Sequence, residues 1–372
     1  MRIGIDLLWV RPGICGGTES YIRNMMHGFG QYDPQNEYVL FVAKDNAETF
    51  RVYEQYPHMG LYVCPTVCAS QMKRLLWENL HLDRTAHRQG VDVMFIPVYS
   101  KPRTYGSRIP YVCAIHDLQA WHYPEYFSRI RCLFMKYMWR YTCRTASQLI
   151  TISEYSRQDI ISHYPVAKGK CNVIYIPVDL SASGMEATQL HEKYGIEKDD
   201  YFYCVSSMLP HKNLDTLLKA MQIRKQQGHT QPLVISGVGG QKEAFRAKVA
   251  ELCIEDVVVD TGFVSNEERD CLYEHCRMFL FPSVFEGFGM PTIEAMSRGK
   301  LVLTTKESCL EEVTKGKAAY VEQPYDAQEW ADKIQWAMTQ QGEAVEFPEY
   351  SLEYATKQTV RLFQRAQNTK YR

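Results

Sequence analysis

Two glutamates, Glu286 and Glu294, and the glycines between them form the stretch of this sequence that is best suited to chemistry. Carboxylates repel phosphate, but they accept hydrogen bonds from hydroxyl groups such as those of a sugar and a ribose. Glycines such as Gly287 and Gly289 let an anion approach the backbone closely. These residue types therefore predict a site for a sugar joined to a diphosphate.

The elements around this stretch are those that an anion site needs. Met278 to Phe281 is an apolar run that predicts a buried strand, and Pro291 stands where a helix begins. Thr292 to Ser297 is compatible with that helix, and Gly299 with its C-terminal end. The start of a helix presents unpaired N–H groups and a partial positive charge. The pattern of strand, glycine loop and helix therefore supports the diphosphate interpretation.

Bulk composition limits the classes of function. At 372 residues the chain has room for two or three domains of roughly 150 residues each. Its formal net charge of -1 argues against a general nucleic-acid binder.

The cysteines and the N-terminus indicate a compartment. The twelve cysteines include no Cys-x-x-Cys pair and no zinc spacing. The N-terminal MRIGIDLLWV is expected to be a first strand rather than a signal peptide, and no apolar run approaches the ~20 residues of a membrane helix. We expect a cytoplasmic protein in which the thiols are small core residues.

The first half of the chain alternates between strands and helices. The expected strands are Ile3 to Val10, Tyr38 to Val42, Leu61 to Cys64, Val91 to Ile96, Tyr111 to Ile115, Leu149 to Ile152 and Cys171 to Ile176. The expected helices are Glu19 to Gly28, Gln71 to Gln89, Pro124 to Thr145 and one capped by Ser153. Such alternation predicts a parallel sheet covered on both faces, with ligands at the carboxyl ends of the strands.

Two features of this half are candidates for the site. His116 follows an apolar strand and stands beside Asp117, which favours a role in the site over a structural one. Gly16 and Gly17 precede a helix that Thr18 could cap, although a tight turn without a ligand is an equal alternative. No dinucleotide fingerprint is present, because the second glycine of Gly-x-Gly-x-x-Gly is replaced by cysteine.

One helix of the first half is strongly basic and aromatic. Ser128 to Arg144 contains five Arg and Lys residues among aromatic and aliphatic ones, and Gln71 to Trp77 is similar in kind. We expect an amphipathic helix with a solvated basic face. Peripheral contact with an anionic membrane surface, at the inner membrane face, is the second interpretation.

The second half begins a new alternating series after a small, polar linker at 177–200. Its expected strands are Tyr201 to Val205, Leu233 to Ser236, Val257 to Asp260, Met278 to Phe281, Leu301 to Thr304 and Ala318 to Val321. Its expected helices include Asn213 to Gln226, Gln241 to Cys253, Ala327 to Thr339 and Ser351 to Ala366. Ser265 and Glu268 have the spacing of a capping box.

Two such halves would leave a cleft at the carboxyl ends of their sheets, where the polar loops converge. Lys212 lies in one of these strand-to-helix loops and is suited to pair with a diphosphate as a point charge.

At this point the sequence resembles the retaining glycosyltransferases of family 4, which have the GT-B fold. The resemblance covers nearly the whole chain. It rests on GGTESYIRN at 16–24, HDL at 116–118, TISEYSR at 151–157, PHKNLDTLLKA at 210–220, TGFVS at 261–265 and EGFGMPTIEAMSRG at 286–299. The last is the family's Glu-x7-Glu signature and the most specific of them. The implied architecture is α/β, with an acceptor-binding Rossmann-like domain at 1–180, a donor-binding one at 195–345 and a last helix, about 351–372, that crosses back onto the first domain.

The resemblance also implies roles for individual residues. Catalytic roles fall to His116, Lys212 and Glu286, with His116 near the primary hydroxyl of the donor sugar. Glu286 would contact sugar hydroxyls, Glu294 the ribose and Lys212 the diphosphate. The other donor-binding positions are Gly16, Gly17, Ser206, His211, Gly262, Phe263, Val264, Gly287, Phe288, Gly289 and Met290.

One departure concerns charge at the diphosphate. Family members often carry arginine at the position of Ser206 and at that of His211. We expect a protonated His211 to supply part of the missing positive charge, and Lys212 and the helix start to supply the rest.

The reaction implied is retaining transfer of a mannose- or glucose-type hexose from a GDP- or UDP-sugar to a hydroxyl of a saccharide or lipid-linked saccharide. No Asp-x-Asp motif is present, so we expect neither a required metal nor a cofactor. A nucleotide-sugar 2-epimerase and a non-catalytic nucleotide-binding assembly protein on the same fold are the alternatives.

Overall fold

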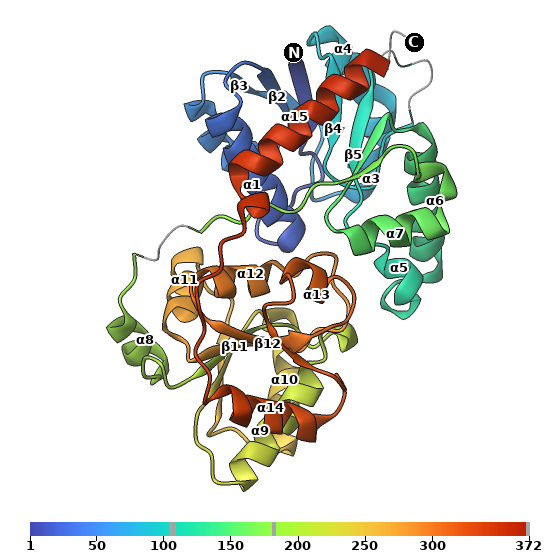
Figure 1. The fold of residues 1–372 in the computed structure, drawn as a ribbon. Helices are drawn as coiled ribbons and strands as arrows, with labels where there is room; N and C mark the ends of the chain where they lie inside the picture. Colours follow the sequence, from blue (N-terminus) through green and yellow to red (C-terminus); the bar gives the residue numbers. More distant parts are fainter. Residues whose placement is uncertain (104–106, 108, 181–183, 370–372) are drawn as a thin grey trace. The chain divides into compact units, whose positions relative to one another are not determined.

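The computed structural model describes residues 1–103, 107, 109–180 and 184–369. Two compact units are present, unit 1 with Met1–Asp179 and Pro348–Arg372, and unit 2 with Leu180–Phe347 (Figure 1). Each is a parallel sheet with helices, which confirms the predicted α/β class with two Rossmann-like halves. Residues 181–183 of the expected linker and 370–372 of the expected last helix lie outside the described residues.

Unit 1 contains a seven-stranded sheet in the order β3-β2-β1-β4-β5-β6-β7, and its paired strands are parallel. The strands are β1 (Arg2–Asp6), β2 (Glu37–Ala43), β3 (Met59–Cys64), β4 (Val93–Ile96), β5 (Tyr111–Ala114), β6 (Gln148–Thr151) and β7 (Cys171–Val173). The order reverses between β1 and β4. In open parallel sheets, ligands bind at the carboxyl edge of such a switch point.

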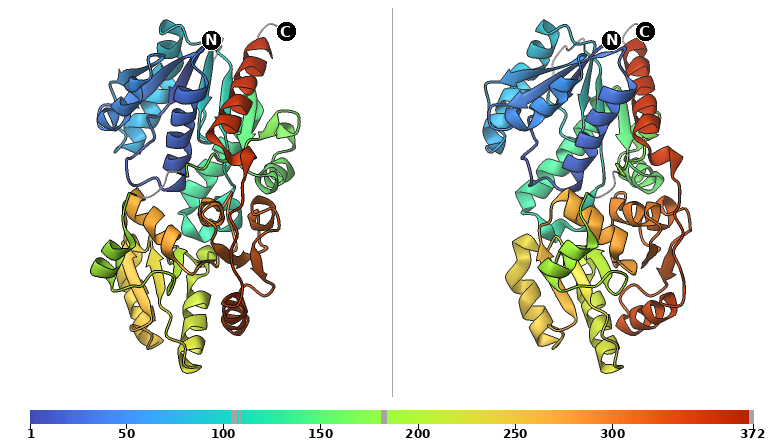
Figure 2. Two further views of the ribbon diagram at one scale, coloured as in Figure 1. Left: turned by 60° about the vertical axis from the view of Figure 1, so that its left-hand side comes forward. Right: turned by 90° about the vertical axis from the view of Figure 1, so that its left-hand side faces the viewer.

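The first and last helices of the chain pack together on one face of this sheet. They are α1 (Gly17–Tyr32) and α15 (Leu352–Thr369), which lie side by side in both views of Figure 2. Gly28 makes this approach possible, because a β-carbon there would lie 2.3 Å from Thr356 Oγ1. Phe363 of α15 packs against Phe95 of β4, with ring centroids 5.5 Å apart.

The opposite face of the unit 1 sheet is covered by the remaining larger helices. Met94 and Ile96 of β4 and Cys113 of β5 pack there with Trp139 and Leu82. The helices are α3 (Gln71–Trp77), α4 (Asp83–Arg88), α6 (Arg129–Thr145) and α7 (Glu154–His163); the short α2 (Ala47–Phe50) and α5 (Gln119–His122) complete the unit.

Unit 2 contains a six-stranded sheet in the order β10-β9-β8-β11-β12-β13, again with parallel pairs. The strands are β8 (Phe202–Val205), β9 (Leu233–Ser236), β10 (Val258–Gly262), β11 (Met278–Phe281), β12 (Leu301–Thr305) and β13 (Ala319–Val321). Its switch point lies between β8 and β11. The loops that follow these two strands therefore emerge side by side.

Helices cover both faces of the unit 2 sheet. On one face α9 (Leu214–Gln226) and α14 (Ala327–Ala337) pack Leu217 and Trp330 against the strands, together with α10 (Lys242–Glu251). On the other face α11 (Asn266–His275) and α12 (Met290–Ser297) contribute Leu272 and Ala295, with α8 (Ala187–Tyr194) beside α11. The short α13 (Leu310–Val313) lies near the end of β12.

Several predicted elements differ from the observed ones. The first strand ends at Asp6 rather than Val10, because the Asp6 carboxylate accepts a hydrogen bond from Leu8 N–H and the chain turns. The helix expected at 71–89 is interrupted by a π-helical turn, Glu78–Leu82. The linker at 177–200 contains the helix α8.

One predicted helix cap is wrong, and one predicted capping box is only half formed. Thr18 lies inside α1, whose N-cap is Gly16. Ser265 does accept a hydrogen bond from Glu268 N–H, but the Glu268 side chain does not return it. That carboxylate instead accepts from Lys193 and Tyr194 of α8, so a distant partner replaces the local one.

Candidate active site

In unit 2, the loops after β8 and β11 are fastened to each other at the switch point. Val284 N–H and the Ser283 hydroxyl both donate to the carbonyl oxygen of His211, at 2.8 and 3.2 Å. Ser283 is in turn held by the neighbouring strand, because Thr305 Oγ1 donates to its carbonyl oxygen at 2.7 Å. These bonds fix the backbone just before Lys212 and just before Glu286.

The structure brings Lys212 and Glu286 together. Lys212 Nζ lies 2.6 Å from Glu286 Oε1, and the two side chains keep 24% and 14% of their surface exposed. The Glu286 backbone is anchored at both ends, since its N–H donates to Ser308 Oγ and its carbonyl oxygen accepts from Cys309 Sγ. An ion pair that stays accessible in this way can exchange partners when an anion and hydroxyl groups arrive.

The glycine loop ends in a strained turn at the start of α12. Gly289 is the N-cap of α12 and has φ 87° and ψ 45°. A β-carbon there would lie 2.8 Å from Leu310 Cδ2, so both the backbone angle and the neighbour require glycine. Phe288 and Phe285 are buried, and Met290 is partly exposed. The first turn of α12 supplies the partial positive charge that the sequence predicts.

Glu294 lies on α12 beside two residues of α11 that the sequence gave no reason to select, Arg269 and Tyr273. Burial raises the pKa of the Tyr273 phenol, and the Glu294 charge raises it further. The Arg269 pKa lies above its ordinary value although burial opposes this, and Glu294 is the main charge that raises it. Arg269 and Tyr273 are four residues apart, so the sequence indicates that they share one face of a helix. It does not indicate that this face lies against Glu294.

His211 does not provide the positive charge that we expected of it. Burial and, to a smaller extent, the Lys212 charge lower its pKa to about 4, against the opposing effect of Glu286. The imidazole is therefore neutral at pH 7, and the prediction of a protonated His211 is wrong. Its ring instead packs edge-on against Phe285.

The remaining predicted donor residues lie along the carboxyl edge of β8, β9 and β10. Ser206 is buried, and its carbonyl oxygen would lie 2.9 Å from a β-carbon on Gly237. Gly262 ends β10, and the ring of Phe263, which is largely exposed, lies over Gly239. Val264 is partly buried against the core. The structure thus places all predicted unit 2 residues at one edge of one sheet.

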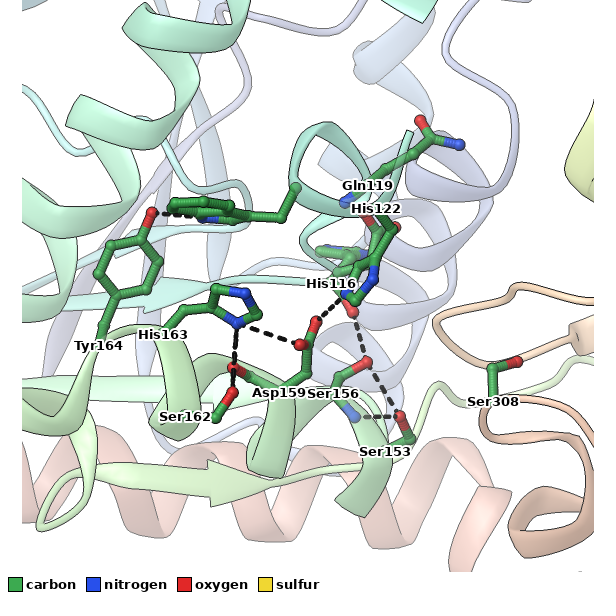
Figure 3. A network of polar contacts seen from close by, with 12 residues as sticks. His116, Gln119, His122, Ser153, Ser156, Asp159, Ser162, His163, Tyr164 and Ser308 are labelled. Atoms are coloured by element: carbon green, nitrogen blue, oxygen red, sulfur yellow. Dashed lines mark hydrogen bonds and ion pairs between the residues drawn. The ribbon is translucent and has the colours of Figure 1, made fainter. Parts of the chain in front are cut away.

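In unit 1, His116 follows β5 and is held by neutral partners. Its Nε2 lies 3.1 Å from the carbonyl oxygen of Pro97, which can only accept, so Nε2 carries the proton and Nδ1 is an acceptor. Burial lowers the pKa of His116 to about 4. Figure 3 shows Ser156 below the histidine, and its hydroxyl donates to the His116 carbonyl oxygen at 2.8 Å. Ser153 in turn donates to Ser156 Oγ and caps α7, as predicted.

Gly16 and Gly17 lie at the start of α1. Gly16 has φ 55° and ψ −138°, and no atom lies within 4 Å of a β-carbon built on it. Glu19 steadies the preceding loop, because its carboxylate accepts from Gly13 N–H and pairs with Arg23. The two glycines thus form a turn with open space on one side.

A buried acidic pair near the unit 1 switch point was not predicted. Asp6 ends β1, and Glu78 lies in the π-helical turn, where Arg74 Nη1 pairs with it at 2.9 Å. Burial raises the pKa of both carboxyls, the Asp6 charge raises that of Glu78 further, and Arg74 opposes both shifts. Sequence patterns do not reveal which carboxylates a fold will bury.

The sequence of the chain matches two family models. "Glycosyltransferase Family 4" matches residues 15–182 and "Glycosyl transferases group 1" matches residues 186–358, which together make up most of the chain. The chain belongs to glycosyltransferase family 4. The predicted resemblance is thereby confirmed, and the family 4 motifs coincide with the two carboxyl edges described above.

Relatives of this family 4 chain come from several organisms. It is 31% identical over 224 residues to the O-antigen chain mannosyltransferase B of Escherichia coli, with 58% of each chain covered. The chain thus spans 58% of the length of that curated relative. It is 25% identical to the uncharacterized glycosyltransferase MJ1607 of Methanocaldococcus jannaschii, with 96% of this chain and 93% of the relative covered.

Solved structures share the fold of the family 4 chain. Anabaena Alr3699/HepE in complex with UDP and glucose has a TM-score of 0.67 and 20% identity, with 100% of this chain and 97% of that chain covered. WaaG, a glycosyltransferase involved in lipopolysaccharide biosynthesis, has a TM-score of 0.67 and 14% identity, with 99% and 95% covered. Together with the two sheets, these likenesses show the GT-B fold.

The described part of the family 4 chain lacks a metal-binding cluster and a membrane-spanning helix. Within residues 1–103, 107, 109–180 and 184–369, no group of three or more His, Cys, Asp or Glu side chains is arranged to hold a metal ion. In the same part of the chain, no helix combines the length and apolar character needed to cross a bilayer.

Proposed function

We propose that this protein is a retaining glycosyltransferase that moves a hexose from a nucleotide diphosphate sugar to a hydroxyl group of a saccharide or lipid-linked saccharide. The observation that carries the proposal is the accessible Lys212–Glu286 pair at the β8/β11 switch point, next to the start of α12. A cation and a helix N-terminus match the diphosphate of such a donor, and a carboxylate at the same place matches the hydroxyls of its sugar.

In the proposed reaction, the bond between the sugar's anomeric carbon and the diphosphate oxygen breaks while the acceptor oxygen bonds to the same carbon. The acceptor proton passes to the departing diphosphate, which leaves as nucleoside diphosphate. Attack from the face that the diphosphate leaves retains the anomeric configuration. Lys212 and the α12 start stabilise the charge that grows on the leaving group, which is the main electrostatic task.

The carboxylates and His116 bind hydroxyl groups in this scheme. Glu286 accepts from the sugar after its ammonium partner turns to the diphosphate, and Glu294 accepts from the ribose. His116 is neutral and offers Nδ1 as an acceptor, so we assign it hydrogen bonding to the donor sugar rather than proton donation. Gly16 and Gly17 let phosphate or acceptor approach their backbone.

We favour mannose as the sugar, because the E. coli relative is named a mannosyltransferase of O-antigen chains. We propose that backbone groups near Phe263 bind the nucleotide base. Backbone contacts do not depend on residue type, so the sequence does not identify the base. The donor is tested by measuring the thermal midpoint of the protein with GDP-mannose, UDP-glucose or UDP-galactose, and comparing each value with that for the corresponding nucleotide alone. Stabilisation by one sugar nucleotide beyond its nucleotide identifies the donor, and no shift with any of them contradicts the proposal.

Product analysis separates transfer from the alternatives. The protein is incubated with the selected donor, with and without a mannose-containing acceptor, and donor and products are followed by mass spectrometry and NMR. A new glycoside with the donor's anomeric configuration supports retaining transfer. Epimerised donor without acceptor identifies a 2-epimerase, and binding without turnover under both conditions identifies a nucleotide-binding protein.

We also propose that the reaction needs no divalent metal, because the sequence lacks an Asp-x-Asp motif and the α12 start with Lys212 meets the diphosphate. The expected result is unchanged turnover after treatment with excess EDTA. Loss of turnover that magnesium or manganese restores would show that this part is wrong.

A further inference from the structure

The outward face of α6 carries large apolar side chains. Ile130 is 82% exposed and Leu133 is 70% exposed, although Cys132, Met135 and Trp139 on the same helix are buried. Burying the aliphatic side chains would be favourable, and the fold leaves them in water. The solvent side of this basic helix therefore carries apolar side chains as well as charged ones.

A second row of exposed apolar side chains lies on α3 and the turn that follows it. Met72, Leu76 and Leu80 stand at intervals of four residues, so they share one side of the helix. Met72 is 83% exposed, and Leu76 and Leu80 are more than half exposed. Like α6, this segment carries basic residues, Lys73 and Arg74, among its apolar ones.

The two rows are neighbours in unit 1. The Arg103 backbone N–H donates to Asn79 Oδ1 in the turn after α3, and its guanidinium donates to the Tyr137 hydroxyl on α6 at 2.6 Å. Deeper in the unit, burial raises the pKa of Tyr99, and the charges of Arg131 on α6 and Arg74 on α3 both lower it. We call the exposed side chains of these segments the α3–α6 face, made up of Met72, Lys73, Leu76, Leu80, Arg129, Ile130, Arg131, Leu133, Tyr137, Arg140 and Arg144.

Charge is concentrated on this face. The whole chain is nearly neutral, with 42 Lys and Arg against 43 Asp and Glu, but Arg129–Thr145 contains five basic residues and no acidic one. The acidic residue that follows α3, Glu78, is buried and paired with Arg74. The acidic side chains near the face are Glu125 just before α6, Asp83 three residues after Leu80, and Asp117, whose charge raises the pKa of Tyr99.

We propose that the α3–α6 face binds the surface of a bilayer that contains anionic phospholipid. Apolar tips separated by arginines suit the headgroup region, where aliphatic side chains enter the acyl boundary while guanidinium groups meet phosphates. The excess of basic over acidic side chains on this face favours an anionic bilayer over a neutral apolar partner. The face does not include the candidate active site residues, so this proposal does not depend on glycosyl transfer.

The test is flotation of the purified full chain with phosphatidylcholine vesicles, with and without about 30% phosphatidylglycerol, in the absence of donor and acceptor. The expected result is binding to the anionic vesicles that falls several-fold between 0.1 and 0.5 M salt, because screening weakens surface charge. Equal binding to both vesicle types, or binding to neither, overturns the proposal.

Variants separate the two contributions. Ile130→Ser/Leu133→Ser should lower partitioning on the order of tenfold, because the apolar tips are lost. Arg140→Ala/Arg144→Ala should lower it about fivefold for each residue and flatten the salt dependence. The matched control is Val52→Ser/Val63→Ser, which removes two exposed aliphatic side chains elsewhere in unit 1.

Fold and partner are checked in the same experiment. Circular dichroism and the thermal midpoint should be unchanged in all variants, since the altered side chains are exposed. If the control loses as much binding as the face variants, or if both face variants bind like the wild type, the α3–α6 face is not the binding surface. If vesicles are not bound and Ile130→Ser/Leu133→Ser abolishes a dimer in size-exclusion chromatography, the face is an interface between copies and the proposal is wrong.

Discussion

The two units place charged side chains near the same kind of switch point but treat them differently. Near β8 and β11, Lys212 and Glu286 form an ion pair that solvent reaches. Near β1, Asp6 and Glu78 are buried, and Arg74 compensates them from one side. The topology is shared, so the difference arises from what covers each edge.

This difference suggests different roles for the two pairs: ligand binding for the pair in unit 2 and proton retention for the pair in unit 1. The Lys212–Glu286 pair is only partly buried, so each partner keeps contact with solvent and can exchange its partner for a ligand. Buried carboxyls lose hydration, which disfavours their charged form and raises their pKa values. Under the proposed function, the unit 2 pair presents charge to a substrate, whereas the raised pKa values of Asp6 and Glu78 favour protonated carboxyls inside the core of unit 1.

The largest expected effect is on the exposed pair. Lys212→Ala should lower kcat/KM for the donor about 100-fold to 1000-fold, because it removes the cation that stabilises the leaving diphosphate. Turnover is measured at saturating acceptor, and the thermal midpoint shows whether the fold survives. Lys317→Ala, at an exposed lysine of the same unit, is the control and should leave turnover unchanged. Activity of Lys212→Ala within threefold of the wild type would remove Lys212 from the site.

Glu294 allows a smaller and more specific test of unit 2. Glu294→Ala should weaken donor binding roughly 10-fold to 100-fold, since the proposed hydrogen bond between its carboxylate and the ribose is lost. Isothermal titration with the nucleotide diphosphate alone is expected to show the same loss, because that ligand retains the ribose. Glu255→Ala removes an exposed carboxylate and serves as the control. Unchanged affinity for the nucleotide would place the ribose elsewhere.

The buried pair of unit 1 should appear in the pH dependence of stability. Because the pKa of Glu78 is raised in the folded state, the native protein holds a proton that the unfolded chain has lost above its ordinary pKa of 4.5. This contribution to the free energy of unfolding therefore falls as pH rises from about 5 toward 8, by up to about 1.4 kcal/mol per pH unit for one proton.

Urea unfolding from pH 6.5 to 8 measures that slope. Glu78→Gln should flatten it, whatever its effect on the absolute stability, and Glu343→Gln, at an exposed carboxyl, should not. Below pH 6.5 the buried histidines act in the opposite direction. Their folded pKa values of about 4 lie below the ordinary 6.5, so stability is lost as pH falls through that interval. An identical slope in Glu78→Gln and the wild type above pH 6.5 would contradict the buried-proton interpretation.

Local patterns predicted the elements of unit 2 well. The strands Leu233–Ser236 and Met278–Phe281 match their predicted bounds, because short apolar runs bounded by polar residues or turns leave little ambiguity. The helix end at Gly299 was also predictable, since Gly299 adopts φ 75° directly after α12.

Features that depend on distant partners were not predictable. Glu268 left its local cap for Lys193, which is 75 positions away in the sequence. Likewise, the neutral state of His211 follows from burial. Arg269 and Tyr273 became neighbours of Glu294 only through the packing of α11 on α12. Sequence periodicity reports which side of an element is apolar, but it does not report what will face that side.

The smallest effect distinguishes the two glycines that begin a helix at these edges, Gly16 of α1 and Gly289 of α12. Either substitution by alanine should cost roughly 1–3 kcal/mol of unfolding free energy because of backbone strain. Only Gly289→Ala adds a side-chain clash, since its β-carbon would meet Leu310 at 2.8 Å whereas Gly16 faces open space. Combining each with Leu310→Val should therefore give a coupling energy of about 1 kcal/mol with Gly289→Ala and none with Gly16→Ala. Equal coupling in both cycles would mean that backbone strain alone, rather than close packing, requires the glycine in unit 2.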